Sequence, residues 1–467
     1  MSLCTTDNNC GVAFDKLGAD GKKPTKSDYA NLSKIANTPI LELVKNNPSL
    51  LIFPQILGAH DDGIEELEIF NLHGNPEKLE DVKLKTGNLM GFVGIGDTQL
   101  KISSRFAKDD EHDFFLHYML EKVFSINLFD YKYTSESGRL DLLMFSFPPL
   151  LKKALAQGIF RQYQTFARND ANVKGVIDVS RHIKQNALFS GKIAYNSRER
   201  TFDNAVTELI RHTIEAIKTK PFGKQLLSSD GETKKCVQEI IEATQSYNLH
   251  EREKVISQNL KPITHPYYTA YKPLQKLCLA ILRHKKIGFG NAKNKAYGIL
   301  FDGAWLWEEY LATVLVPAGF KHPRNKENRG GIRMFANDID ENSFDKNYRR
   351  IYPDFYKPNE CILDAKYKRL QNGVGREDLY QIVTYMHTVK IDHGGFLYPI
   401  PQTDFENDND NKKTYKLAGY GGTISTIGFP IPQAKSSRLE FLESMKETEG
   451  VLRSYEWNDA ISELFGV

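Results

Sequence analysis

One mostly apolar strand pattern in the C-terminal third constrains the fold of this 467-residue chain more than any other feature. Residues 361–368, CILDAKYK, follow a polar turn, PNE, and an earlier strand pattern, RRIYPDFYK. A largely apolar strand has to be buried between layers rather than lie on a surface. The neighbouring patterns supply those layers: a long helix pattern at 303–320, then a helix pattern at 376–390 and an apolar strand pattern at 394–401. This order predicts an α/β core.

The length of the chain predicts more than one domain, because a single core of ordinary size uses fewer residues. Residues 1–48 are rich in Asp, Asn, Lys and Gly and are predicted to form a loosely structured lead-in. Residues 49–290 combine a β-rich part with a helical part, and a basic, glycine-bearing stretch separates them from residues 291–467. The predicted fold class is α+β and multidomain, with an N-terminal β-rich and helical region before the C-terminal α/β core.

The helical part of the N-terminal region has several amphipathic patterns. Residues 191–219 predict a strand followed by a long helix, with Asp203 as the N-cap of that helix. Two further helices are predicted at 234–247 and 274–284.

Two aspartates and a lysine on the predicted hairpin form a candidate catalytic site. Asp354 and Asp364 lie on either side of the turn, so antiparallel pairing brings both carboxylates to one end of the sheet. Asp364 and Lys366 share a face because side chains alternate along a strand. Carboxylate oxygens suit Mg²⁺, which stabilises the charge that develops in phosphodiester hydrolysis. Lys366 is assigned mainly to positioning the attacking water, because a lysine beside two carboxylates stays protonated.

Three further residues are placed to support this site. Gln381 and Tyr385 lie on one face of the helix predicted after the hairpin, so both side chains can face the same strand end. The helix pattern before the hairpin offers Glu308 or Glu309 as a third metal ligand that acts through water, and Glu308 is the preferred candidate. For all of these residues, and for the Asp-x-Lys pattern itself, an ordinary solvated surface is the alternative.

Basic residues near the hairpin are candidates for contacts with a DNA backbone, since lysine and arginine can follow phosphates without reading the sequence. They are Lys321, Arg324, Lys326, Arg329, Arg349 and Arg350. Charged loops that only contact solvent are the alternative. The net charge of +3 over the whole chain neither requires nor excludes nucleic acid.

Taken together, the motifs PD, D-x-K and Q-x-x-x-Y resemble those of the PD-(D/E)xK nucleases. The segments YGILFDGAWLWEEYL, YPDF, CILDAKYK and DLYQIVTYM are similar to McrC and LlaJI-like restriction proteins, and the likeness continues upstream in VKGVIDVSRHIKQN and GKIAYNSRERTFDN. The resemblance implies a restriction-endonuclease-like C-terminal core. It also implies that Asp354, Asp364 and Lys366 match the catalytic trio, with Glu308, Gln381 and Tyr385 at supporting positions.

The same resemblance implies an activity and partners. McrC-like proteins are Mg²⁺-dependent DNA endonuclease subunits of restriction systems that act in antiviral defence, and Mn²⁺ can substitute for Mg²⁺. They cut double-stranded DNA with McrB, a hexameric AAA+ GTPase that their N-terminal region binds and stimulates. Cleavage of both strands implies a dimer in the working complex. This chain has no G-x-x-x-x-G-K-[ST] loop, so no nucleotide is expected to bind the chain alone.

Two other functions fit part of the sequence. One is a non-catalytic subunit that assembles and activates the motor, and the other is a stand-alone RecB-like DNA-repair nuclease. The presence of both aspartates and the lysine disfavours the first, and the second leaves the long N-terminal region without a role.

The composition predicts a cytoplasmic protein. No apolar run approaches the roughly 20 residues of a membrane helix, and the first ten residues lack the pattern of a secretory signal. The five cysteines are scattered, without a CxxC pair, which argues against a disulfide framework and a zinc site.

Overall fold

The computed structural model describes residues 1–47, 50–54, 67–106, 113–124, 144, 147–188, 190–220, 223–228, 231–283, 296–323, 330–335, 350–368, 370, 373–407, 412–419, 421–432 and 438–454. The chain forms two compact units. Unit 1 consists mainly of Met1–Val123 and Ala292–Val467, and unit 2 mainly of Asp130–Asn291. The end of unit 2 at Asn291 lies within one residue of the boundary predicted between residues 290 and 291. The difference is that residues 1–123, predicted to precede or belong to the N-terminal domain, are in unit 1 with the C-terminal part of the chain.

The N-terminal sheet of unit 1 explains this division. In spatial order its strands are β1 (Ser2–Thr6), β7 (Thr98–Ser103), β6 (Leu89–Ile95), β11 (Ala296–Asp302) and β3 (Leu50–Phe53). β11 comes from the C-terminal part of the chain, yet it lies between β6 and β3 and is buried along its length. Because a buried strand needs hydrogen-bond partners for its backbone, this sheet requires both parts of the chain.

The segment predicted to be a loose lead-in is folded. Residues 1–47 contain β1, β2 (Val12–Ala13), α1 (Lys26–Leu32) and α2 (Ile40–Asn46). β2 joins β5 (Lys83–Thr86) and β4 (Phe70–His73) in a small sheet. Leu3 and Phe14 are fully buried, and the side chains of Thr25 and Asp28 form a capping box at the start of α1. The prediction was wrong because polar residues here form caps and turns.

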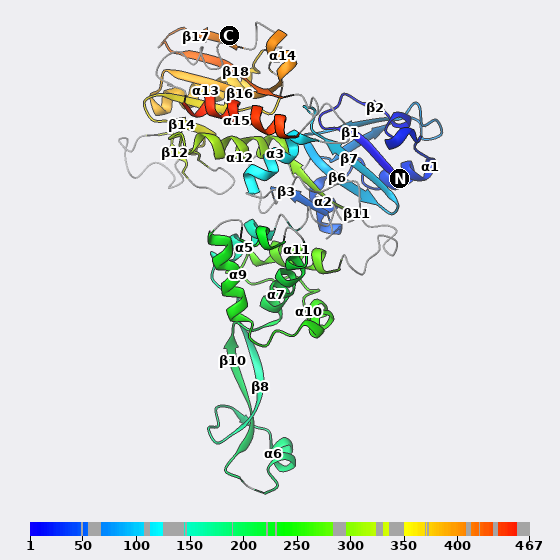
Figure 1. The fold of residues 1–467 in the computed structure, drawn as a ribbon, viewed down its shortest axis with the longest axis vertical. Helices are drawn as coiled ribbons and strands as arrows, with labels where there is room; N and C mark the ends of the chain where they lie inside the picture. The colour runs from blue at the N-terminus through cyan, green and yellow to red at the C-terminus, as the bar shows by residue number, and fades with distance from the viewer. Residues whose placement is uncertain are drawn as a thin grey trace. The chain divides into compact units, whose positions relative to one another are not determined.

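A second five-stranded sheet in unit 1 carries the candidate site (Figure 1). In spatial order its strands are β14 (Phe355–Lys357), β15 (Cys361–Ala365), β16 (His393–Pro401), β18 (Thr423–Ile431) and β17 (Lys412–Lys416). β15, β16 and β18 are parallel, whereas β14 and β17 are antiparallel to their neighbours.

Helices cover the two faces of this second sheet. α13 (Arg376–Val389) packs on one face in a cluster with Ile362 and Phe396. α12 (Gly303–Leu315) packs on the other, where the ring of Trp307 meets that of Phe429. The described residues of unit 1 also include helices α3 (Phe114–Phe124), α14 (Gln402–Asn407) and α15 (Arg438–Ser454). The prediction of a mixed α and β fold is confirmed, and the apolar strand β15 lies between helical layers.

The strand pattern before the hairpin is interrupted. β13 (Arg350–Ile351) pairs with β12 (Ile332–Arg333), and β14 begins only at Phe355. Pro353 falls in the gap, where its lack of an N–H group removes no hydrogen bond from the ladder. Asp354 therefore lies immediately before β14.

Unit 2 is a group of helices with a β-hairpin (Figure 1). Its helices are α5 (Phe147–Leu155), α7 (Ala205–Lys218), α8 (Gly223–Leu226), α9 (Gly231–Ala243), α10 (Arg252–Gln258) and α11 (Tyr271–Arg283). β8 (Gln162–Asp170) and β10 (Ile193–Thr201) pair along their whole length, and β9 (Val176–Ile177) and α6 (Val179–Gln185) lie at the far end of this hairpin. In the described part of the chain, no helix is both long and apolar enough to cross a membrane.

The sequence predicted Asp203 as the N-cap of α7, but the N-cap is Asn204. The Asn204 side chain accepts hydrogen bonds from the backbone N–H groups of Val206 and Thr207. Asp203 instead accepts a hydrogen bond from the backbone of Ser246. The two residues are adjacent and both are good caps, so the sequence could not separate them.

Candidate active site

The hairpin of β14 and β15 brings Asp354 and Asp364 together. Phe355 pairs with Leu363, so the next step of the antiparallel register sets Asp354 opposite Asp364. The backbone N–H of Ala365 donates a hydrogen bond to Asp354 Oδ2 at 2.7 Å, which fixes that carboxylate at the end of β15. Asp364 is 2% exposed, and Asp354 is partly exposed.

Lys366 lies on the same face as Asp364, as the alternation along the strand predicted. Its Nζ is 2.6 Å from Asp364 Oδ2 and 3.2 Å from Asp378 Oδ1. Asp378 lies in the first turn of α13 and also pairs with Lys368 at 2.5 Å. Asp378 was not among the predicted site residues, although an acidic residue in the first turn of the helix after the hairpin is a recognisable signal.

The pKa values of Asp354 and Asp364 are both raised above that of an ordinary aspartate. Burial raises the pKa of Asp354 well above its ordinary value, and the charges of Asp364 and Glu308 raise it further. Burial also raises the pKa of Asp364, although the Lys366 ammonium opposes that shift. Burial alone would lower the pKa of Lys366, but Asp364 and its neighbours outweigh burial and the net shift is upward. Lys366 therefore stays positively charged beside two carboxyl groups that are costly to ionise.

Glu308 approaches this group from α12, and a histidine that the sequence analysis missed links it to Asp354. His322 Nε2 lies 3.9 Å from Glu308 Oε1 and 3.9 Å from Glu309 Oε1. Its Nδ1 donates to the backbone oxygen of Asp354 at 2.7 Å, and its ring stacks on Phe355. His322 sits in a basic loop with no motif around it, so no sequence signal pointed to it.

Gln381 and Tyr385 lie on α13, and the structure brings them to each other. Gln381 Nε2 donates to Tyr385 Oη at 2.8 Å. Tyr385 is buried, and burial raises the pKa of its hydroxyl to about 12, with the charges of Asp354 and Asp364 adding to the shift. Gln381 is exposed. The charges of the two aspartates thus act on the buried phenol, and the amide of the exposed Gln381 contacts that phenol.

Two of the six basic candidates are described by the structure. Lys321 is exposed, forms a backbone bridge with Tyr356 and holds its ammonium 5.6 Å from the Tyr356 ring. Arg350 is exposed and donates to the backbone oxygen of Gly331. The other four, Arg324, Lys326, Arg329 and Arg349, lie outside the described residues.

Comparison with known proteins decides the family. The model of the family described as "McrBC 5-methylcytosine restriction system component" matches residues 84–399, more than half of the chain. The chain belongs to this McrBC family. The match includes the hairpin, the acidic pair and Lys366, and it confirms the resemblance noted in the sequence.

Solved structures similar to this McrBC-family chain come from Thermococcus gammatolerans. One is a half-complex from a tetradecameric assembly of McrB AAA+ hexamers with bound McrC; it is 15% identical, covers 97% of this chain and 99% of the matched chain, and has a TM-score of 0.47. Another is the McrBC complex, 15% identical over 68% of this chain and 88% of the matched chain, with a TM-score of 0.31. No curated protein sequence matches the chain.

The residues at the hairpin of this McrBC-family chain fit a hard cation in chemical type. Asp364 Oδ2 is buried and, apart from its ion pair with Lys366, has no hydrogen-bond partner in the described part of the chain. Among the described residues, no group of three or more His, Cys, Asp or Glu side chains is arranged to hold a metal ion. A cation here would have two adjacent carboxylates and would keep several waters, which is the usual state of protein-bound Mg²⁺.

Proposed function

We propose that this McrBC-family chain is the DNA endonuclease subunit of a McrBC-like restriction system, either modification-dependent or of the LlaJI type. In this proposal the second sheet is a PD-(D/E)xK core that hydrolyses phosphodiester bonds with Mg²⁺, or with Mn²⁺ in its place. The observation that carries the proposal is the juxtaposition of Asp354, Asp364 and Lys366 at one strand end, with Asp364 buried. A buried carboxylate beside a second carboxylate and an ammonium is costly to hold in place, so a fold retains such a group for a function.

Asp354 and Asp364 would hold the metal ion, with Glu308 joining through water. The ion would stabilise the negative charge on the phosphorane-like transition state and lower the pKa of a bound water. The raised pKa values of both aspartates support this assignment, because a bound cation offsets the cost of ionising them. His322 would hold Asp354 and Glu308 in position, since it contacts the Asp354 backbone and lies near Glu308.

Lys366 would position the attacking water and neutralise the scissile phosphate. Its pKa is shifted upward, so it remains an ammonium and not a general base at neutral pH. Asp378 would keep the ammonium in place, since its Oδ1 lies 3.2 Å from Lys366 Nζ. Tyr385 and Gln381 would supply a hydroxyl and an amide at the edge of the same site.

The proposed macromolecular partners are double-stranded DNA and a hexameric AAA+ GTPase. Lys321 and Arg350 are exposed basic residues on the polypeptide that leads into the acidic hairpin, where they could contact phosphates. Since each chain carries one candidate site, cutting both strands calls for two chains in the cleaving complex.

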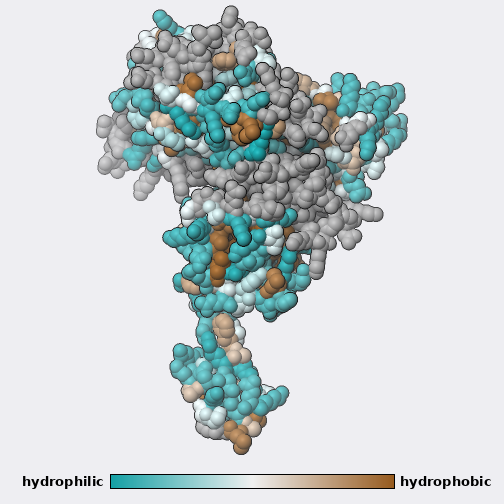
Figure 2. Space-filling model, viewed as in Figure 1, coloured by the Kyte–Doolittle hydropathy of each residue, from teal (hydrophilic) through white to brown (hydrophobic). Residues whose placement is uncertain are grey.

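The hairpin of unit 2 is the proposed docking element for the GTPase. Its far end exposes apolar side chains that a soluble protein normally buries (Figure 2). Their exposed fractions are 78% for Val176, 62% for Val179, 64% for Ile183 and 92% for Leu188. An extended hairpin with an apolar end suits insertion into a protein partner better than contact with DNA phosphates.

The test of the nuclease proposal is reconstitution with the AAA+ partner and cutting of methylated and unmethylated plasmid in the presence of GTP and Mg²⁺. Lys366→Ala and Asp364→Asn should each lower the cleavage rate by at least about 100-fold, because each removes a charge that the transition state requires. Stimulation of the partner's GTPase should be unchanged. Lys357→Ala is the matched control, since Lys357 lies on the same hairpin but pairs with Glu360 near the turn.

The same assay separates the rival functions. A chain that only assembles and activates the motor would give no cutting, with full GTPase stimulation in wild type and variants alike. A stand-alone repair nuclease would cut equally well without the partner. Either result would overturn the proposal.

The docking proposal has its own test. The double variant Ile183→Asp, Leu188→Asp should lower stimulation of the partner's GTPase by about tenfold or more, because it sets two charges in an apolar contact. The control is Leu249→Asp, which changes a leucine that is 63% exposed elsewhere in unit 2. Equal stimulation by the two variants would exclude the hairpin end as the docking surface.

A further inference from the structure

The residue after Lys366 is anchored in the N-terminal sheet of unit 1. Tyr367 is 4% exposed, and its Oη lies 2.9 Å from Ser104 Oγ and 3.2 Å from Met90 Sδ. Met90 is on β6 and Ser104 directly follows β7. Gly303, at the start of α12, has no room for a Cβ, because that atom would lie 2.6 Å from the Tyr367 ring. The ring is therefore held from three directions.

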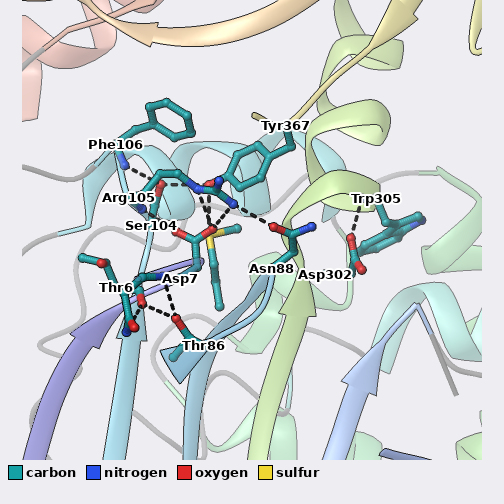
Figure 3. Close-up of polar contacts among 12 residues, drawn as sticks. Thr6, Asp7, Thr86, Asn88, Ser104, Arg105, Phe106, Asp302, Trp305 and Tyr367 are labelled. Carbon is teal, nitrogen blue, oxygen red and sulfur yellow. Dashed lines mark hydrogen bonds and ion pairs between the residues drawn. The ribbon is translucent and has the colours of Figure 1, made fainter. Parts of the chain in front are cut away.

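Arg105 covers one face of the same ring. Its guanidinium carbon lies 4.9 Å from the centre of the Tyr367 ring (Figure 3). The guanidinium donates to Asp7 Oδ2 through Nε at 2.9 Å and through a terminal nitrogen at 2.7 Å, and it also donates to Asn88 Oδ1 at 2.8 Å. Asp7 has a fully buried side chain and directly follows β1. The Arg105 guanidinium is thus held by Asp7 at the end of β1 and by Asn88 directly before β6.

Ser104 is also held by several hydrogen bonds. Its backbone N–H donates to the Asp113 carboxylate, which also accepts a hydrogen bond from the backbone of Leu116 in α3. Its hydroxyl accepts from the N–H of Phe106, whose ring packs edge-on against Tyr367. We call Asp7, Ser104, Arg105 and Tyr367 the tyrosine clamp.

The tyrosine clamp fixes the backbone from which Lys366 extends. The N–H of Lys366 donates to the backbone oxygen of Leu397 on β16, which holds one side of this backbone. Tyr367, the next residue, holds the other side through contacts with the N-terminal sheet. A lysine side chain has four rotatable bonds, so its ammonium stays between Asp364 and Asp378 only if the backbone is fixed.

We propose that Tyr367 is a positioning residue: through its contacts with Ser104 and Arg105 it sets the place of the Lys366 ammonium and so couples the N-terminal sheet to hydrolysis. This role rests on the proposed nuclease function. A packing role alone would be filled by phenylalanine, whereas this ring carries a hydroxyl at a buried serine and a guanidinium on its face.

The test compares Tyr367→Phe with Tyr118→Phe. Both changes remove one buried tyrosine hydroxyl from unit 1, and the hydroxyl of Tyr118 donates to Glu449 at 2.7 Å, away from Lys366. Each variant is assayed for cleavage in complex with its AAA+ partner, which gives kcat and KM for DNA. In parallel, the full chain is labelled with ¹³C at the lysine Cε, and the Lys366 signal is assigned with Lys366→Arg.

Tyr367→Phe should lower kcat by roughly 10- to 100-fold with KM for DNA unchanged, since a catalytic group displaced by about 1 Å has an effect of that size. The Lys366 signal should move toward that of solvent-exposed lysines. Ser104→Ala should lower kcat in the same way, and the double variant should be no worse than the more severe single one, because the contact between the two hydroxyls is lost in either. Tyr118→Phe should change neither readout, even if it lowers the thermal midpoint equally.

An unchanged Lys366 signal in Tyr367→Phe would overturn the inference, as would a fall in kcat that Tyr118→Phe reproduces. If the wild-type complex does not cut DNA, the nuclease proposal fails while the Lys366 signal still decides whether the clamp holds the lysine.

Discussion

Asp354 shows how a single residue can trade stability against function. Its carboxyl group is partly buried and lies near the charges of Asp364 and Glu308, so its pKa in the folded chain is well above the value of about 4 expected in an unfolded chain. A group with a raised folded pKa stabilises the fold at low pH and loses that contribution as pH rises. Asp354 therefore destabilises the metal-free protein at neutral pH.

Asp354→Asn should raise the free energy of unfolding of the metal-free protein by about 1 kcal/mol at pH 7.5, because the amide oxygen can still accept the Ala365 hydrogen bond without a charge. This gain should shrink as pH falls through the raised folded pKa of Asp354, and it should vanish below about pH 4, where the wild-type carboxyl is neutral in both states. Mg²⁺ should then stabilise the wild type and not the variant. Calorimetry with and without Mg²⁺ across this pH range measures all three effects.

The exposed Asp392 supplies the control for Asp354. Asp392→Asn should leave both the stability and the response to Mg²⁺ as in the wild type. Equal stabilisation of the wild type and Asp354→Asn by Mg²⁺ would rule out Asp354 as a metal ligand.

At the scale of elements, helix α7 depends on a cap that also fastens it to its surroundings. Asn204 accepts two backbone hydrogen bonds at the helix start, and its amide donates to the backbone oxygens of Phe160 and Phe202. Asn204→Ala should lower the free energy of unfolding of unit 2 by about 2 kcal/mol, at the upper end for N-caps, because all of these partners are left buried. Urea unfolding followed by circular dichroism measures the loss.

Asp203→Ala is the comparison for this cap. The Asp203 side chain accepts one backbone hydrogen bond, from Ser246 at an exposed position. Asp203→Ala should therefore lower the free energy of unfolding by less than half as much as Asn204→Ala. A larger effect at Asp203 would mean that the capping role has been assigned to the wrong residue.

At the scale of the whole molecule, unit 1 is held together by contacts between distant parts of the chain, and Glu449 on α15 is one centre of them. This residue is 1% exposed and accepts hydrogen bonds from Tyr118 and Lys122 on α3 and from Tyr310 on α12. Glu449→Ala leaves the partly exposed Lys122 ammonium and two buried hydroxyls without this acceptor. The free energy of unfolding of unit 1 should fall by about 3 kcal/mol, as when one member of a buried ion pair is removed.

Denaturant unfolding of the full chain measures this loss, with Glu447→Ala as the control at an exposed position of the same helix. Because α3 and α15 should loosen together, tryptic cleavage in both helices should speed up in Glu449→Ala. Accelerated cleavage in α15 alone would contradict the view that Glu449 joins the two parts of unit 1.

The sequence by itself determined the local parts of the site. The hairpin, the apolar strand and the alternation of side chains along it brought Asp354, Asp364 and Lys366 to one place, because register and alternation are set by neighbouring residues. The helix with Gln381 and Tyr385 followed from its period for the same reason. The family resemblance rested on these same motifs.

Only the tertiary structure decided the contacts between distant residues. Ser104 and Tyr367 are 263 positions apart, and nothing in either neighbourhood specifies the other. β11 looked like the start of a separate domain, yet it completes the N-terminal sheet, because a buried strand takes its partners from whichever edges the fold presents. His322 gained its place beside Asp354 in the same way. Pairing over such distances depends on the packing of the whole unit, and a linear pattern does not record it.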